Sequence, residues 1–482
     1  MIYDLLVIGG GINGAGIARD AAGRGLSTVL VERGDLAGAT SSASSKLIHG
    51  GLRYLEQYEF RLVAEALAER EILLRVAGHL AWPVRFVMPH VAELRPRWMI
   101  RTGLFLYDHL ARRSVLPASQ AVRLDAPPYS SGLQSRLKHG FVYSDCRVDD
   151  SRLVVLNAVD ASRRGTRILV RTECRSAERR DGVWRAALSN GEEVAARAVV
   201  NAAGPWVKEV LDQRLHQPSR DSVRLVKGSH VVLPKLYEGD HAFILQNDDR
   251  RVVFMIPFEE EFTLVGTTDV PVTEAQGLQP SDEEVRYLCA AASRYLAQPV
   301  DAGNVRWRYA GVRPLHDDGE ENPSAVTRDY SLLVHDEAGA APVLSVFGGK
   351  ITTYRRLAEQ AVDKLRTYFP AMRAAWTEGT ALPGSDFASR AAARHAVFEK
   401  YRALPEQVVR GAFRRHGTEA PQVLGDGNLG EDFGAGLTER EVRHFLEREW
   451  ASTAEDVLWR RTKCGLHMTE QQRQRVAQVV GR

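Results

Sequence analysis

Cysteine is scarce in this sequence, and long apolar runs are missing from it. The four cysteines are Cys146, Cys174, Cys289 and Cys464. They form no Cys-x-x-Cys pair and have no histidine at metal-ligand spacing. The pattern therefore argues against a disulfide framework or a metal site and favours reduced packing residues in a cytosolic compartment. No run of about 18 apolar residues occurs, which excludes a transmembrane helix. If the protein works at a membrane, we expect it to lie on the surface.

A strong net charge is also absent. The 64 Lys and Arg residues nearly balance the 61 Asp and Glu residues and leave a net charge of +3. So mild an excess does not by itself indicate binding to nucleic acid. Of the 482 residues, 44% are hydrophobic and 26% are charged. This composition is typical of a globular protein, and the length indicates two or three domains.

The N-terminus contains a dinucleotide-binding fingerprint. Gly9-x-Gly11-x-x-Gly14 follows a predicted strand at 4–8 and opens a predicted helix, and Glu32 ends the next predicted strand. The first glycine permits a tight turn, the second lets the backbone approach the pyrophosphate, and the third lets helix and strand pack closely. We expect Glu32 to accept hydrogen bonds from the ribose, and its charge argues against NADP. The fingerprint alone leaves NAD and FAD open.

A second segment, residues 40–54, favours FAD. It reads Thr-Ser-Ser-Ala-Ser-Ser-Lys-Leu-Ile-His-Gly-Gly-Leu-Arg-Tyr. Clustered hydroxyls can donate hydrogen bonds to phosphate and ribityl oxygens, and adjacent glycines let the main chain approach a flat ring. A solvated loop would explain the serines alone. It does not explain the His-Gly-Gly-Leu-Arg-Tyr that follows them.

The chain resembles the FAD-dependent, quinone-linked (aerobic) glycerol-3-phosphate dehydrogenases of the D-amino-acid-oxidase-like superfamily over nearly its whole length. The matching segments are 7–14, 44–54, 201–206, 227–230, 266–269, 309–314, 327–330, 348–353 and 449–462. The resemblance implies an α/β fold: a Rossmann-type FAD-binding domain interleaved with an antiparallel β substrate-cap domain, then a C-terminal helical domain. We expect the FAD domain at about 1–75, 145–220 and 305–375, the cap at about 76–144 and 221–304, and the helical domain at 381–482.

The resemblance also implies a non-covalently bound FAD and the residues that contact it. These are Gly9, Gly11, Asn13, Gly14, Glu32, Arg33, Thr40, Ser41, Ser42, Lys46, Leu47, His49, Cys174, Ala203, Gly204, Trp206, Gly311, Gly349, Lys350 and Thr352. The turn at 348–353 begins a predicted helix whose N-terminus would face the pyrimidine end of the flavin, where the reduced ring carries negative charge.

The implied substrate, sn-glycerol 3-phosphate, is a dianion whose pocket needs fixed positive charge, preferably guanidinium groups. The expected substrate-binding residues are Arg53, Tyr54, Arg313, Arg328 and Lys350. Any one of these cations could instead be a solvated surface charge. Their place beside glycine-rich turns, rather than on helix faces, favours the binding role.

Oxidation to dihydroxyacetone phosphate needs hydride transfer to flavin N5 and loss of the hydroxyl proton. A neutral imidazole suits the second task, so His230 is the first candidate base and His49 the second. Either histidine could instead be a structural hydrogen-bonding group. Arg313 could lower the pKa of the alcohol and make a dedicated base unnecessary. Asp269 is a weaker candidate and is better suited to orienting a neighbour.

The electron acceptor is the least determined part of the prediction. No haem or iron–sulfur ligand pattern occurs, and the resemblance implies ubiquinone, a peripheral position on the cytoplasmic face of the inner membrane and, as one option, a homodimer. Residues 95–113 mix aromatic residues with arginines, as an interfacial segment would, although an ordinary amphipathic core helix explains them equally well. The alternatives are a glycerol-3-phosphate oxidase that uses oxygen, an amine or amino-acid oxidase of the same fold, and a non-enzymatic dinucleotide-binding scaffold.

Several secondary-structure elements can also be placed. We expect helices at 56–77 and 281–297 and antiparallel strands at 168–171, 183–188 and 194–200. In the C-terminal part, capping boxes at Thr438…Glu441, Ser452…Glu455 and Thr469…Gln472 should each start a helix.

Overall fold

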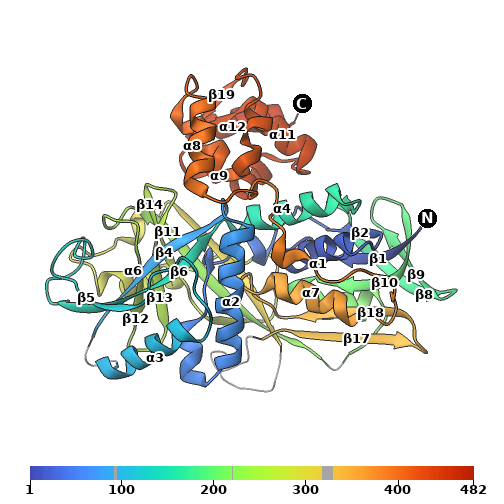
Figure 1. The fold of residues 1–482 in the computed structure, drawn as a ribbon, viewed down its shortest axis with the longest axis horizontal. Helices are drawn as coiled ribbons and strands as arrows, with labels where there is room; N and C mark the ends of the chain where they lie inside the picture. The colour runs from blue at the N-terminus through green and yellow to red at the C-terminus, as the bar shows by residue number, and fades with distance from the viewer. Residues whose placement is uncertain (92–94, 220, 317–328, 482) are drawn as a thin grey trace.

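Two large β-sheets form the body of the molecule, and a helical domain lies across one end of it (Figure 1). The computed structural model describes residues 1–91, 95–219, 221–316 and 329–481. In these ranges no helix is long and apolar enough to cross a membrane. The expected α/β architecture with a C-terminal helical domain is confirmed.

The first sheet is mainly parallel and has the order β17-β18-β10-β1-β2-β7. Its strands are β1 (Ile2–Ile8), β2 (Thr28–Val31), β7 (Arg167–Leu169), β10 (Glu193–Asn201), β17 (Ser331–Glu337) and β18 (Ala340–Phe347). The helices α1 (Ile12–Gly23), α4 (Asp150–Arg163) and α7 (Tyr354–Lys364) pack together beside it. A hairpin of β8 (Cys174–Arg180) and β9 (Val183–Leu188) extends from β10.

The predicted pairing was partly wrong in this sheet. The strand expected at 168–171 pairs in parallel with β2, and the one expected at 194–200 pairs in parallel with β1 and β18. Of the contacts made by the three expected strands, those of β9 with β8 and β10 are antiparallel, as expected. Short alternating segments indicate a strand but not its partner, because partners are chosen by the crossovers of the whole chain.

The second sheet is mainly antiparallel. In its order β15-β11-β14-β13-β12-β4-β6-β3, the bounds are β15 (Val270–Val272), β11 (Val223–Pro234), β14 (Phe262–Gly266), β13 (Val252–Phe258), β12 (Ala242–Gln246), β4 (Ala81–Pro89), β6 (His139–Val148) and β3 (Leu47–Ile48). β16 (Trp307–His316) pairs with β11, and β5 (Gln120–Arg123) pairs with β6. β6 and β16 thus belong to this sheet, although the expected boundaries near 145 and 305 put parts of them in the FAD domain. The domain division stays a proposal.

Two helices beside the second sheet, α2 (Phe60–Val76) and α6 (Asp282–Ser293), lie close to their expected ranges. The segment 95–113 contains a third, α3 (Arg97–His109). Helix α6 starts with a capping box of Ser281 and Glu284, which was not predicted from the sequence. The same Glu284 also pairs with Lys227 on β11 at 2.8 Å, so this cap ties α6 to the sheet.

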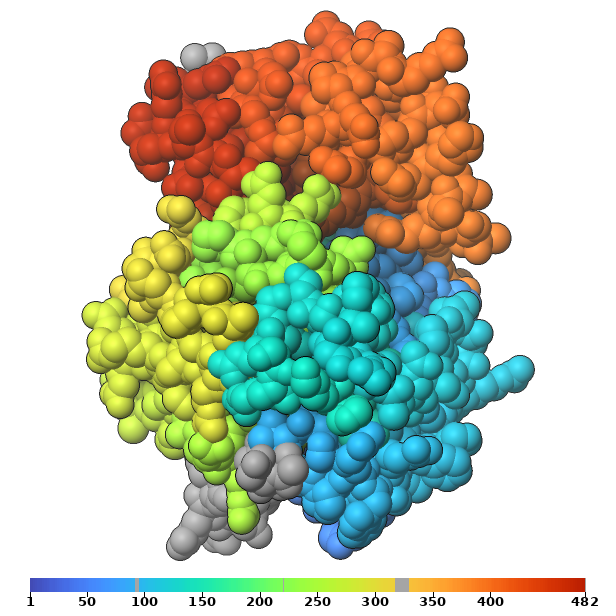
Figure 2. Space-filling view, turned by 90° about the vertical axis from the view of Figure 1, so that its left-hand side faces the viewer, coloured from blue at the N-terminus to red at the C-terminus, as the bar shows by residue number. Residues whose placement is uncertain are grey.

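The C-terminal domain contains α8 (Arg390–Lys400), α9 (Glu406–His416), α10 (Ala420–Leu424), the strands β19 (Asp432–Gly434) and β20 (Leu437–Thr438), α11 (Glu439–Arg448) and α12 (Glu470–Val480). It sits across the body (Figure 2) and contacts the turn between β13 and β14 of the second sheet, where Arg414 pairs with Glu259 at 2.5 Å.

Only one of the three expected capping boxes in this domain is confirmed. Thr469 and Gln472 cap α12 reciprocally. The box at Ser452 is wrong by one residue, because Thr453 and Asp456 exchange the backbone hydrogen bonds instead. Thr438 does precede α11, but its side chain caps nothing.

Glu441 leaves the Thr438 box because the buried guanidinium of Arg415 and the imidazole of His416 hold it. Arg415 donates to both of its carboxylate oxygens at 2.7 and 2.6 Å, and His416 lies 2.9 Å away. Burial alone would raise the pKa of Glu441, but Arg415 and His416 lower it to about 2. Burial lowers the pKa of His416 to about 4, against the opposing effect of Glu441.

We expect acid to destabilise the C-terminal domain in two overlapping steps. Both folded-state pKa values lie below their usual values of 6.5 for His416 and 4.5 for Glu441. The contribution of these two groups to the free energy of unfolding is therefore fully present at neutral pH. It falls between about pH 6.5 and 4, as the unfolded chain protonates His416, and again between about pH 4.5 and 2, as the unfolded chain protonates Glu441. Each step is worth up to about 3 kcal/mol.

The measurement is the thermal unfolding midpoint against pH, followed for the wild type and for Glu441→Gln. The variant should be less stable at pH 7 and should have a flatter profile below pH 4.5. A variant whose profile runs parallel to that of the wild type would contradict the assignment.

Candidate active site

The glycines of the fingerprint pack as tightly as a dinucleotide turn requires. A Cβ on Gly14 would lie 1.9 Å from the carbonyl oxygen of Gly9, and Gly9 itself has φ +113 and packs on Ala202. The turn thereby brings the start of α1 beside the segment that follows β10, where η3 (Gly204–Trp206) begins. Ala203, which the expected cofactor residue Gly204 follows, thus lies beside Gly9 of the fingerprint.

The start of α1 is arranged to receive an anion. The N-cap residue, Gly11, has no side chain to cap the helix, and of the first N–H groups that of Ile12 donates to Ser41 Oγ at 3.0 Å. The Oδ1 of Asn13 is buried without a hydrogen-bond partner among the described residues, while its Nδ2 donates to the carbonyl of Gly348 at 3.2 Å. A buried, unsatisfied acceptor next to free helix N–H groups fits the hydroxyl and phosphate groups of a dinucleotide.

Glu32 and its neighbours form the end of the site expected to hold the adenosine. Glu32 accepts hydrogen bonds from the N–H groups of Gly10 at 2.6 Å and Gly34 at 2.7 Å. Burial raises its pKa, and these two donors oppose the rise. The guanidinium of Arg33 lies 4.0 Å over the ring of Trp206. The backbone N–H of Thr172, two residues before Cys174, donates to the carbonyl of Glu32 at 2.8 Å.

The segment 40–50, which we call the flavin loop, is held by residues of the first sheet's helices and the second sheet. It contains η1 (Thr40–Ser42) and β3. Lys46 Nζ donates to Asp150 at 2.9 Å and to the carbonyl of Ser42 at 2.9 Å, and Ser44 Oγ donates to Asp150 at 2.7 Å. Thr40 Oγ1 donates to the carbonyl of Val312 on β16 at 2.6 Å. The Lys46 ammonium is thus engaged by Asp150.

Several predicted site residues meet on one face of the second sheet. Residues directly opposite each other in antiparallel strands share a face. β11 and β16 pair His230 with Tyr309 and Gly228 with Gly311, so these residues and Arg313, two positions further, face the same way. A Cβ on Gly311 would lie 2.7 Å from the carbonyl of Ala43, which places this face against the flavin loop. The space beside Gly228 is filled as well, since a Cβ on it would lie 2.5 Å from Nη2 of Arg313.

His230 is held firmly in its place on this face. Its Nε2 lies 2.8 Å from Ser45 Oγ, and its ring stacks on Tyr309 with centroids 4.9 Å apart. Burial lowers the pKa of His230 well below its usual value, and the positive charges of Lys46 and Arg313 add to the effect. The imidazole is therefore neutral at pH 7.

The second histidine, His49, lies at the far end of the same region. Its main-chain N–H donates to Thr352 Oγ1 at 3.3 Å, and its ring meets Phe254 edge-on with centroids 6.3 Å apart. Phe254 is in register with Gly266, which is in register with His230, so the three positions share the face described above. Thr352 and His49, which are far apart in sequence, are brought together.

Two of the expected phosphate-binding cations have defined environments. Arg313 pairs with Asp269 at 2.7 Å and donates to the carbonyl of Thr268 at 3.0 Å. The ammonium of Lys350 lies 4.2 Å over the ring of Tyr54. Arg53 lies half-buried in η2 (Leu52–Gln57). Arg328 falls outside the described residues.

Three residues that build this site were not predicted from the sequence. Asp150 anchors the flavin loop, and Tyr309 and Phe254 line the sheet face. The acidic pair that follows the strand-like segment 141–148 was a usable signal for Asp150, since an acidic residue at a strand-to-helix junction is suited to binding polar loops. Phe254 stands in an ordinary strand pattern that carries no such signal. Leu47 and Cys174 have buried side chains, so only their main chains remain for cofactor contact.

Comparison with known proteins gives matches along the whole chain. Residues 4–355 match the family model described as FAD dependent oxidoreductase, and residues 375–482 match the C-terminal domain of alpha-glycerophosphate oxidase. Aerobic glycerol-3-phosphate dehydrogenase of Escherichia coli is 49% identical, over 98% of this chain and 96% of the relative. D-erythritol 1-phosphate dehydrogenase of Brucella abortus is 48% identical, over 98% and 96%.

A solved structure has a similar fold over almost the whole chain. The crystal structure of the Bacillus halodurans glycerol-3-phosphate dehydrogenase complexed with FAD superimposes with a TM-score of 0.72 at 25% identity, covering 99% of this chain and 93% of that one.

Proposed function

This chain belongs to the family of FAD-dependent, aerobic glycerol-3-phosphate dehydrogenases, and we propose that it oxidises sn-glycerol 3-phosphate to dihydroxyacetone phosphate, with hydride passing to N5 of FAD and the electrons then passing to a membrane quinone. FAD, when bound, supplies the two-electron acceptor for this oxidation. The observation that carries the proposal is the shared face of β11 and β16, which places Arg313 and a neutral His230 beside the flavin loop, on which Gly311 packs.

The proposed phosphate contacts come from Arg313 and Lys350, with Arg53 and Tyr54 closing the pocket. A guanidinium suits this role because its planar N–H groups match two phosphate oxygens at once. Asp269 and the carbonyl of Thr268 hold the Arg313 fork in one orientation. Asp269 is thus a positioning residue in this proposal, and Arg328 would complete the set of cations.

For the hydroxyl proton, the environment of His230 favours a role as an acceptor over a role as a charged donor. Its neutral ring can take a proton through Nε2 or through the Ser45 hydroxyl that Nε2 contacts. His49 would instead contact the flavin side of the pocket through its main chain. A nearby guanidinium stabilises a developing alkoxide, so Arg313 would assist whichever group takes the proton.

The deciding experiment is anaerobic mixing of the FAD-loaded protein with sn-glycerol 3-phosphate. We expect the yellow flavin absorption to bleach within the time of one turnover and to return on addition of a quinone. Protein that does not bleach, or that never binds FAD, would refute the proposal. Stoichiometric peroxide in the absence of quinone would indicate an oxidase, and bleaching by glycine or a D-amino acid alone would indicate an amine oxidase.

A second substrate needs a direct comparison, because a relative 48% identical to this chain is named for D-erythritol 1-phosphate. The two alcohols share the phosphate and differ in length by one hydroxymethylene. The ratio of kcat/KM for the two substrates decides between them, and we expect it to favour glycerol 3-phosphate.

The proposed contact with the membrane rests on α3 and its surroundings. One side of α3 is in the core through Ile100, Leu104 and Tyr107, as an amphipathic core helix requires. The other side exposes Trp98 and Phe105, which are 70% and 60% accessible. Figure 1 places α3 at the end of the body opposite the C-terminal domain, near α2. Exposed aromatic side chains beside arginines are typical of segments that lie in an anionic lipid interface.

We expect Trp98→Ser combined with Phe105→Ser to weaken binding to vesicles containing anionic lipid by about tenfold or more, because both side chains would lose their burial in the interface. Sedimentation with vesicles measures the effect. Ile2→Ser removes an apolar residue that is 56% exposed on β1 and serves as the matched control. Equal losses in both proteins would contradict a specific role for α3.

A further inference from the structure

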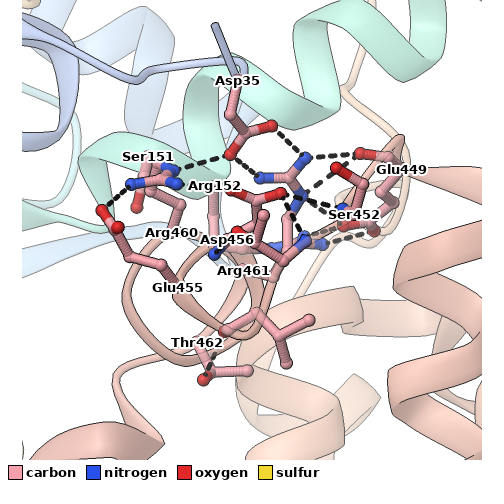
Figure 3. Close-up of polar contacts among 12 residues, drawn as sticks. Asp35, Ser151, Arg152, Glu449, Ser452, Glu455, Asp456, Arg460, Arg461 and Thr462 are labelled. Atoms are coloured by element: carbon pink, nitrogen blue, oxygen red, sulfur yellow. Dashed lines mark hydrogen bonds and ion pairs between the residues drawn. The ribbon is translucent and has the colours of Figure 1, made fainter. Parts of the chain in front are cut away.

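The tetrapeptide 460–463 starts at the end of η8 (Asp456–Arg461) in the C-terminal domain. Its first two side chains, Arg460 and Arg461, extend to Asp35 in the FAD-binding region (Figure 3). The fully buried guanidinium of Arg461 donates to both carboxylate oxygens of Asp35 at 2.7 Å, and Arg460 Nε donates to Asp35 Oδ2 at 2.6 Å. Asp35 is 4% exposed. Its charge is therefore balanced by two cations from the far end of the chain.

Asp35 lies in the segment that closes over the fingerprint turn. Its carbonyl accepts the N–H of Gly38 at 2.9 Å, and the N–H of Ala37 donates to the carbonyl of Gly10 at 3.1 Å. Gly10 in turn donates its N–H to Glu32. The position of Asp35 thus fixes the segment from Glu32 to Gly38 relative to the dinucleotide turn.

The same tetrapeptide also reaches the support of the flavin loop. Lys463 Nζ donates to Ser151 Oγ at 2.9 Å, in the first turn of α4. The backbone N–H of Ser151 donates to Asp150 Oδ1 at 2.9 Å, and Asp150 is the residue that holds Lys46 and Ser44. Residues 460–463 therefore bind both loops that are expected to contact FAD, one through Asp35 and the other through Ser151 and Asp150.

Two further pairs reinforce the docking around this tetrapeptide. Arg152, next to Ser151, forms a buried ion pair with Glu449, and the Arg461 guanidinium donates to the carbonyl of Glu449 at 2.6 Å. Arg171, whose N–H donates to the carbonyl of Gly34, pairs with Asp456 at 2.7 Å. The buried Arg152–Glu449 pair holds one arrangement, because separating it would leave both charges without partners.

We propose that the C-terminal domain is a clamp on the FAD loops, with Arg461 and Lys463 as positioning residues, so that docking of this domain and binding of FAD stabilise each other. The proposal rests on the FAD site described above. Coupling between two binding events is reciprocal, so a loss at the clamp weakens FAD binding and FAD in turn tightens the clamp.

The first test measures the dissociation constant of FAD with apoprotein by fluorescence titration. Arg461→Gln should raise it by about tenfold or more, within the usual range of such couplings. Lys463→Gln should raise it less, since Lys463 acts through Ser151 and Asp150. Arg443→Gln breaks an exposed pair with Glu439 in the same domain and should leave the constant unchanged. At saturating FAD, KM for glycerol 3-phosphate should be the same in all four proteins, which a general loss of structure would not allow.

The second test needs no variant. Hydrogen exchange of the wild-type amides at 449–464 should slow when FAD is added to the apoprotein, although these residues lie behind the loops. Unchanged exchange, or FAD affinities for the Arg461 and Lys463 variants within twofold of the wild type, would overturn the clamp. If Arg461→Gln does not fold, Arg460→Gln, which leaves Arg461 on Asp35, takes its place with a smaller expected loss. A wild-type apoprotein that never binds FAD would instead refute the proposed function.

Discussion

Arg313→Ala is expected to raise KM for glycerol 3-phosphate by about 10- to 100-fold while FAD stays bound. A hydrogen bond to a charged group contributes about 1.5–3 kcal/mol, which corresponds to this range. Removal of the guanidinium also leaves Asp269 facing the pocket, and its carboxylate would repel the phosphate. Steady-state kinetics with a soluble electron acceptor give KM, and the flavin absorbance of the purified protein gives its FAD content.

The matched control for this variant lies on the same strand. Arg308 also stands on β16, but its side chain forms an exposed pair with Asp282 at 2.7 Å. Arg308→Ala should leave KM unchanged. Arg313→Lys should recover part of the loss, because a lysine restores the charge without the planar fork. If KM of Arg313→Ala stays within twofold of the wild type, the phosphate lies elsewhere.

Gly14→Ala is expected to abolish FAD binding at micromolar concentrations. The added methyl group would lie 1.9 Å from the carbonyl oxygen of Gly9. The turn cannot move away easily, because Gly9 is itself pressed against the backbone of Ala202. Helix α1 would have to shift from β1, which misaligns the N–H groups that face the pyrophosphate.

Absorbance of the purified variant and titration with added FAD measure this effect. Gly103 supplies the control, because nothing lies within 4 Å of a Cβ added at this position inside α3. Gly103→Ala should bind FAD normally. It should also gain about 0.5–1 kcal/mol in stability, because alanine loses less conformational entropy than glycine when the helix forms. A yellow Gly14→Ala protein with wild-type affinity would show that the turn does not hold the pyrophosphate.

The parts of the site predicted from sequence are those whose chemistry is local. Gly9, Gly14 and Glu32 could be assigned because a turn, a helix start and a strand end follow each other within one βαβ unit. The family resemblance then extended the prediction to positions such as Arg313 and Lys350, which no spacing rule connects. Their roles remain proposals, but the fold that brings them near the flavin loop is confirmed.

The errors arose where tertiary contacts override local preferences. Glu441 satisfies the capping-box pattern, yet the guanidinium of Arg415 and the imidazole of His416, both on α9, bind it instead. The strand β7 has an ordinary alternating pattern, yet its neighbour β2 lies across a long connection and imposes parallel pairing. The contact of His230 with Ser45 joins two different motifs, and neither motif alone could indicate it.

The pairing of Asp35 with Arg461 has a consequence for biosynthesis. The two residues are 426 positions apart, so at about 5–20 residues per second the ribosome needs roughly 20–90 s to supply the partner after Asp35 is made. The central strand β1 also remains without one of its parallel neighbours for some time, because β10 is translated only after eight other strands. The nucleotide-binding unit is therefore translated first and completed last. A nascent chain that stops short of its final helices would expose this unit to chaperones and proteases.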